Sequence, residues 1–357
     1  MPYGKVLVVD DVSTNLDVAR GMMAAYEGLL IHCVTSGMDA INMIRKEEIR
    51  YDVVFMDHMM PGLDGVQTVK IIRDEIGSEY ARTVPIVALT ANAIVGNDKM
   101  FLENGFQAFL AKPIDVVKLD AVLRQFVRDK QSPETIREAE TRPREAGGKC
   151  GREAILMSLL EKTRISGVDI NAGLKRFNDV PSVYLDVVKS FVQNVPKFLE
   201  SLRGVTEQTL CEYAVTVHGV KGSCYGICAD EAGRMAEVLE ISAKSGDFAR
   251  VMAGSETFIC KTEELLSQLK ALFESADNVR EEADSGRDAL PEPDRELLAK
   301  MLNASQDYDI DAMQGVMEEL ERHKYESGQE LISWLKGRLV SFGYEEISEK
   351  LKETLQG

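Results

Sequence analysis

The stretch YDVVFMDHMMPGLDG, residues 51–65, constrains the fold of this chain more than any other. A short apolar run, residues 53–56, ends abruptly at the acid Asp57, and a turn-forming Pro-Gly pair follows. An apolar run of this length, bounded by turn signals, is typical of a strand that is buried on both faces of a parallel sheet. Open α/β sheets bind ligands just outside the carboxyl ends of their strands. Asp57 is therefore placed where chemistry is expected, although a lone acid there could simply cap a turn.

Four further apolar runs in the first 129 residues are predicted to be strands, and helical periodicity separates them. The predicted strands cover residues 5–9, 29–35, 53–56, 85–89 and 106–111. The first predicted helix is capped by Ser13 or Thr14 and carries apolar residues at 16, 19, 22 and 23. The other predicted helices cover residues 37–47, 65–75, 94–103 and 116–127. This alternation predicts an α/β domain at 1–129, a five-stranded parallel, doubly wound sheet with helices on both faces.

Polar groups follow four of the five predicted strands and should meet at one edge of the sheet: Asp10, Asp11, Asp57, Thr90 and Lys112. Three crowded carboxylates raise one another's pKa, and a hard cation such as Mg²⁺ removes that conflict. Phosphoryl oxygens could then lie between the metal, the Lys112 ammonium and the Thr90 hydroxyl. Asp57 could attack phosphorus as a carboxylate nucleophile. Each residue alone could be a cap or a surface ion pair, but the ordered set predicts a phosphoacceptor site.

Residues 3–129 also resemble a two-component receiver domain, through the motifs VVDD, MDHMMPGLDG, LTAN and KP. The resemblance implies that Asp57 is phosphorylated. It implies a set of magnesium ligands, which are Asp10, Asp11, Asp57 and the main-chain carbonyl of Met59. Two residues are implied to switch together when the phosphoryl group arrives, Thr90 and Phe109. His58 lies beside the acceptor, but no step requires a base there, and we interpret it as an ordinary loop residue.

Residues 154–275 show helical periodicity and no alternation of period two, which predicts an all-α bundle of the four-helix type. One predicted helix carries a core stripe at residues 217, 220, 224 and 227. His218, Lys221, Gly222 and Tyr225 share the neighbouring face. A histidine beside a core stripe is usually a packing residue. Here Lys221 could offset phosphoryl charge, and Gly222 would leave room for the imidazole at a cost of about 1 kcal/mol in helix stability.

The segment HGVKGS, residues 218–223, resembles the H-x-x-K-G-S signature of histidine-containing phosphotransfer (HPt) domains. The later segment LEISAKSGD, residues 239–247, matches as well, and the resemblance covers about 110 residues of the bundle predicted at 154–275. It implies that His218 is a second phosphoacceptor, with an imidazole that is open to solvent. Cys228 is a departure, because these domains often have glycine at that position.

The remaining segments are assigned from composition. Residues 130–153 and 276–291 are rich in charge and poor in large apolar groups, which predicts flexible linkers. Residues 292–357 predict a small acidic helical domain for docking or dimerisation, with Trp334 as a core anchor, unless they extend the bundle. Residues 281–357 hold 19 acidic against nine basic side chains, which argues against a DNA-reading module.

The overall composition limits the partners. A net charge of −17 argues against direct binding to nucleic acid. No apolar run approaches the roughly 20 residues of a membrane span, and no leader is evident, so we expect no membrane insertion. Six scattered cysteines without a metal or disulfide spacing are consistent with a reduced, cytoplasmic protein.

These features predict a phosphorelay signalling protein with Mg²⁺ as its cofactor. A sensor histidine kinase upstream would phosphorylate Asp57, and His218 would pass the group to or from a response-regulator receiver downstream; a homodimer is also compatible. No Gly-rich ATP-binding region is present, so kinase activity is not expected. One alternative is the C-terminal part of a split or truncated hybrid sensor histidine kinase. Another is a sporulation-type response regulator that acts in transcription control.

Overall fold

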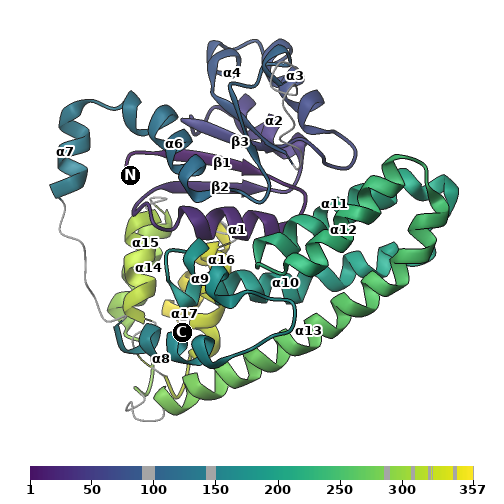
Figure 1. Cartoon of the computed structure of the whole chain (residues 1–357). Helices are drawn as coiled ribbons and strands as arrows, with labels where there is room; N and C mark the ends of the chain where they lie inside the picture. The colour runs from purple at the N-terminus through teal and green to yellow at the C-terminus, as the bar shows by residue number, and fades with distance from the viewer. Residues whose placement is uncertain are drawn as a thin grey trace. The chain divides into compact units, whose positions relative to one another are not determined.

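The computed structural model describes residues 1–90, 101–141, 150–284, 290–306, 310–320, 323, 325–340 and 344–356. The chain divides into two compact units, Met1–Asp277 and Asn278–Gly357. The first unit contains a β-sheet and a helical bundle, and the second is helical in its described part (Figure 1).

A five-stranded parallel sheet forms the α/β domain, with the strand order β2-β1-β3-β4-β5. Its strands are β1 (Lys5–Val9), β2 (Leu30–Val34), β3 (Val53–Asp57), β4 (Ile86–Thr90) and β5 (Ala108–Ala111). One face packs on α1 (Ser13–Met23) and α6 (Val116–Phe126), and the other on α2 (Gly37–Lys46), α3 (Gly65–Asp74) and α4 (Glu79–Thr83). The predicted doubly wound sheet is confirmed. The helix predicted at 94–103 lies mostly outside the described residues.

The following part of the chain is all-α, as predicted. Its helices are α8 (Cys150–Lys162), α9 (Ile170–Arg176), α10 (Pro181–Leu202), α11 (Leu210–Gly226), α12 (Asp230–Lys244) and α13 (Phe248–Asp284). The predicted core stripe of α11 is fully buried at residues 217, 220, 224 and 227. Helix α10 is one continuous helix, where the sequence predicts two shorter helices at residues 183–191 and 196–202. The helix continues because Val195 and Leu199 bury in the same core.

Both segments predicted to be flexible linkers contain helix. Helix α7 (Pro133–Thr141) lies within 130–153, and α13 runs on to Asp284, within 276–291. Helix α7 has a local start signal, because Ser132 Oγ accepts the main-chain N–H of Thr135 and proline occupies the first turn. Between residues 255 and 284 there is no glycine or proline to end α13. Composition alone therefore failed to predict α7 and the last part of α13.

Cys228, which follows α11, has a left-handed backbone with φ of 63°. Glycine adopts this conformation without steric cost, whereas an L-residue with a side chain adopts it rarely. The chain accommodates cysteine here, and the Cys228 carbonyl accepts the main-chain N–H of Asp169.

The α/β domain and the bundle share one continuous hydrophobic core, because α1 packs against α10 and α11 (Figure 1). Three glycines of α11 allow the close approach: Gly219, Gly222 and Gly226. A Cβ at Gly219 would lie 2.6 Å from Cγ2 of Val12, and one at Gly226 would lie 2.6 Å from Cγ2 of Val18. We call these three positions the glycine face of α11.

Gly222 has a different role from the one that the sequence suggested. A Cβ at this position would lie 3.0 Å from Nδ2 of Asn15, at the contact with α1. The missing side chain therefore makes room for the α/β domain.

The second unit contains α14 (Arg295–Gln306), α15 (Ile310–Leu320), α16 (Gln329–Val340) and α17 (Tyr344–Gln356). The sequence predicts amphipathic helices close to these, at residues 297–302, 311–321, 330–340 and 345–355. Its core is aliphatic and methionine-rich, with Met301, Met313, Leu335 and Ile347 fully buried. Trp334 is only partly buried against this core, with the Arg338 guanidinium 5.7 Å from its ring centroid. The prediction that Trp334 anchors the core is wrong, since the aliphatic residues fill the centre. No helix in the described ranges has the length and apolar character of a membrane span.

The glycine face generates a prediction about docking. The double variant Gly219→Ala/Gly226→Ala should push α1 away from α11, at a cost of about 1–3 kcal/mol for each overpacked site. His218 should then react faster with diethyl pyrocarbonate, as measured by mass spectrometry. Gly337→Ala is the matched control, because a Cβ at Gly337 meets nothing within 4 Å. Equal His218 reactivity in the double variant and the control would contradict this account.

Candidate functional site

The sheet edge gathers the acidic residues as predicted. Carboxylate oxygens of Asp10, Asp11 and Asp57 lie within 4.8 Å of one another. Lys112 Nζ lies 2.6 Å from Oδ2 of Asp10 and 2.9 Å from Oδ2 of Asp57. Asp10 and Asp57 are each only 1% exposed. Parallel pairing of β1 and β3 puts both strand ends at this edge.

The electrostatics of this cluster favour a cation. Burial, with Asp10 and Asp57 adding to it, raises the pKa of Asp11 to about 7. Burial also raises the pKa of Asp57, although the Lys112 ammonium opposes the shift. For Lys112, desolvation is outweighed by Asp10 and Asp57, which raise its pKa. Three carboxylates around one ammonium leave negative charge uncompensated, and these oxygens could hold a divalent cation.

Three other residues were predicted to belong to the receiver site, and they lie near this edge of the sheet or in the core behind it: Met59, Thr90 and Phe109. Thr90, at the end of β4, is 1% exposed, and its carbonyl accepts the main-chain N–H of Lys112. The Met59 N–H donates to Oδ1 of Asp57 over 3.4 Å. Phe109, on β5, is partly buried and stacks on Phe101 with ring centroids 6.3 Å apart. The coupled switch of Thr90 and Phe109 stays a prediction.

His218 is buried, so the prediction that its imidazole is open to solvent is wrong. Its side chain is 3% exposed, because the α/β domain docks over this face of α11. Nδ1 lies 2.8 Å from Oε1 of Glu240. Nε2 is buried and, within the described part of the chain, is the one buried side-chain nitrogen or oxygen without a hydrogen-bond partner. Burial lowers the pKa of His218, which favours the neutral ring.

Glu240, on α12, fixes the tautomer of that neutral ring. The carboxylate can only accept, so Nδ1 carries the proton and Nε2 keeps a free lone pair. Glu240 also accepts from Lys221 Nζ over 2.5 Å and from Lys244 Nζ over 2.6 Å. Burial alone would raise the pKa of Glu240, but His218 and the two lysines hold it well below its usual range.

This network adds two residues to those that the sequence singled out. Lys221 was expected to offset phosphoryl charge; its ammonium is bound by Glu240, and that role stays a prediction. Sequence reasoning missed Glu240 and Lys244, which lie one helical turn apart in LEISAKSGD. That i, i+4 spacing of opposite charges was the available signal.

The two halves of the site meet at the residues after Asp57. The rings of His58 and His218 are nearly perpendicular, with centroids 5.9 Å apart. Met59 Sδ lies 3.1 Å from Lys244 Nζ. Charges on Asp57 and Lys112 also act on the His218 imidazole. His58, interpreted from sequence as an ordinary loop residue, is therefore part of the contact between the domains.

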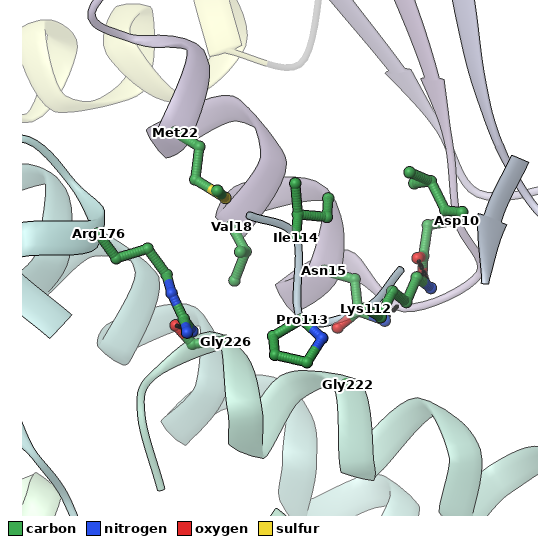
Figure 2. Close-up of a pocket in the computed structure, with 11 residues that line it drawn as sticks. Asp10, Asn15, Val18, Met22, Lys112, Pro113, Ile114, Arg176, Gly222 and Gly226 are labelled. Carbon is green, nitrogen blue, oxygen red and sulfur yellow. Dashed lines mark hydrogen bonds and ion pairs between the residues drawn. The ribbon is translucent and has the colours of Figure 1, made fainter. Parts of the chain in front are cut away.

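Asn15, also missed by sequence reasoning, connects the acidic edge to α11. Its Nδ2 donates to Oδ1 of Asp10 over 3.0 Å, and its Oδ1 accepts from Ser223 Oγ over 3.3 Å. A cavity of about 30 Å³ lies beside these bonds, between α1, the segment 112–114 and α11 (Figure 2). Figure 2 shows Asn15 and Lys112 above Gly222, on the glycine face. The cavity is large enough for a water molecule.

Comparison with known proteins identifies the α/β domain. Residues 6–124 match the family model of the response regulator receiver domain. This part of the chain is therefore a receiver domain of the kind found in two-component phosphorelay systems.

Individual relatives align with about a third of this chain, and the aligned part spans less than a quarter of their own length. The chain is 37% identical over 127 residues to the osmosensing histidine protein kinase SLN1 of Saccharomyces cerevisiae, an alignment that covers 34% of this chain and 10% of that protein. It is 35% identical over 129 residues to the transcription factor SKN7 of Candida albicans, and this alignment covers 36% of this chain and 22% of that protein. A similar solved structure is the receiver domain of a Pseudomonas aeruginosa sensor histidine kinase, which has a magnesium ion in its active-site cleft. That structure is 33% identical in sequence to this chain, with a TM-score of 0.31. The match covers 35% of this chain and 98% of the solved one.

The acidic cluster predicts a pH-dependent metal affinity. Mg²⁺ binds the ionised carboxylate, and Asp11 has a pKa of about 7, so protons compete with the cation below that pH. The affinity for Mg²⁺, measured by calorimetry, should rise about tenfold per pH unit below this pKa and level off above it. Asp11→Asn should weaken binding and reduce this dependence, while Asp39→Asn, at an exposed site, should change neither. A flat profile in the unaltered protein would contradict the assignment.

Proposed function

We propose that this chain is a phosphorelay protein in which Asp57 and His218 exchange a phosphoryl group within one molecule. Residues 154–275 then act as the HPt domain of the receiver at 6–124. A histidine on a sensor kinase supplies the group to Asp57, and His218 passes it to the receiver of a downstream response regulator. The observation that carries the proposal is the buried, unpartnered Nε2 of His218 against the acidic edge.

The first step is transfer to Asp57. Its carboxylate oxygen attacks phosphorus and forms an acyl phosphate, while the donor histidine keeps the electron pair of the broken N–P bond. Bound Mg²⁺, held by Asp10, Asp11 and Asp57, would neutralise charge on the phosphoryl oxygens. Lys112, already within 2.9 Å of Asp57, pairs with the same oxygens, and Thr90 lies at the same edge. We extend the proposal to Thr90 and Phe109 as the residues that respond to phosphorylation.

The second step is transfer to His218. The lone pair of Nε2 attacks phosphorus, the bond from phosphorus to the Asp57 oxygen breaks, and the carboxylate leaves with its electron pair. No proton has to be removed from Nε2, because the Nδ1–Glu240 hydrogen bond places the proton on the other nitrogen. The ring gains positive charge as the N–P bond forms, and the Glu240 carboxylate stabilises that charge. The reverse reaction uses the same groups.

The arrangement of the two domains favours transfer within one chain. The shared core and the glycine face hold the receiver on the bundle, so His218 meets its own receiver at a high effective concentration. The same contact covers His218. Delivery to another protein then requires the two domains to separate.

The relatives do not by themselves select among the functions that use a receiver. Their names include histidine kinases and a transcription factor, and each alignment covers about a third of this chain. The imidazole that faces Asp57 is the feature that favours a relay over a kinase fragment or a transcription regulator.

Two substitutions test the relay. Asp57→Asn should abolish Mg²⁺-dependent labelling of the whole chain by a radiolabelled acyl-phosphate donor. His218→Gln should leave Asp57 labelled and abolish the acid-labile, alkali-stable phosphohistidine. His323→Gln, at an exposed histidine of the second unit, is the control and should behave like the unaltered protein. Labelling of Asp57→Asn at the usual level, or phosphohistidine in His218→Gln, would exclude the proposed roles.

A further inference from the structure

His58, which follows Asp57 in the sequence, contacts His218, the second proposed phosphoacceptor. His58 belongs to the receiver and His218 to the bundle, and their ring centroids are 5.9 Å apart at an interplanar angle of 84°. This perpendicular arrangement is one that aromatic rings prefer. Among the described residues it is the one ring contact that His218 makes.

The receiver holds the His58 ring from several sides. Its Nδ1 donates to the carbonyl of Leu89, in β4, over 3.2 Å. The same nitrogen lies 3.8 Å from Oδ1 of Asp57, and the ring meets that of Phe101 edge to face, with centroids 6.0 Å apart. The orientation of His58 is therefore set by the same sheet edge that places Asp57.

The His218 ring, in contrast, has a single hydrogen bond. Glu240 binds Nδ1 and determines which nitrogen is the nucleophile. One bond at one atom leaves the ring able to tilt about that atom, and a tilt moves the lone pair of Nε2 off its line to phosphorus. A second contact, on the ring itself, removes that freedom.

We propose that His58 is a positioning residue, whose ring holds the His218 imidazole in the orientation from which Nε2 reaches the phosphoryl group on Asp57. This inference rests on the proposed function. His58 is not assigned proton transfer, because Nε2 carries no proton to be removed. Its role is to set the plane of the nucleophile by ring contact, so another ring of similar size should serve.

The test compares two variants of the full chain, His58→Ala and His58→Phe. Each is labelled at Asp57 with an acyl-phosphate donor and Mg²⁺, freed of the donor, and followed as Asp57-phosphate is converted to His218-phosphate. His58→Ala should slow this conversion on the order of 10- to 100-fold, because small misplacements of reacting groups have effects of this size. His58→Phe should restore most of the rate, and His323→Ala should have no effect. The initial labelling of Asp57 should be the same in the unaltered protein and in all three variants.

Each contrary result has a distinct meaning. Conversion in His58→Ala at the unaltered rate overturns the inference, and so does His58→Phe that is as slow as His58→Ala. A parallel loss of Asp57 labelling also overturns it, because His58 would then act on the acceptor. No conversion in the unaltered protein would instead contradict the proposed function.

Discussion

The closeness of α1 and α11 is the constraint on which the rest of this site depends. Side chains at Gly219 and Gly226 would collide with Val12 and Val18, so helices with larger residues there could not pack at this distance. Glycine inside a helix is unfavourable by about 1 kcal/mol relative to alanine. The contact with the receiver is what offsets that cost. It brings the acidic sheet edge and the His218 imidazole together, each contributed by a separate domain.

Two buried charge networks face each other across this contact. In the receiver, the Lys112 ammonium lies between Asp10 and Asp57; in the bundle, Glu240 accepts from two lysines and from His218. Buried charges are tolerated when they are paired in this way, and removal of one partner leaves the other uncompensated. The bundle network leaves Nε2 of His218 without a hydrogen-bond partner. In the receiver, Lys112 and the Met59 N–H hold the two carboxylate oxygens of Asp57.

The receiver site was predictable from sequence because its geometry follows from topology. Apolar runs identify the strands, parallel pairing aligns their carboxyl ends, and Asp10, Asp57 and Lys112 must then meet. The burial of His218 and its bond to Glu240 were not predictable in this way. They depend on how α11 and α12 pack, which brings together two residues that are 22 positions apart in sequence. They also depend on a docking surface formed by another domain. The glycine spacing of i, i+3 and i+7 on α11 was the one local signal of that surface.

Transfer between Asp57 and His218 in the same molecule is the central claim, and its dependence on protein concentration tests it most directly. The chain would be labelled at Asp57, freed of donor, and diluted in series before the appearance of His218-phosphate is timed. A first-order rate that stays constant on dilution is the predicted result. A rate that falls in proportion to protein concentration would show that phosphate moves between molecules, and would contradict the account.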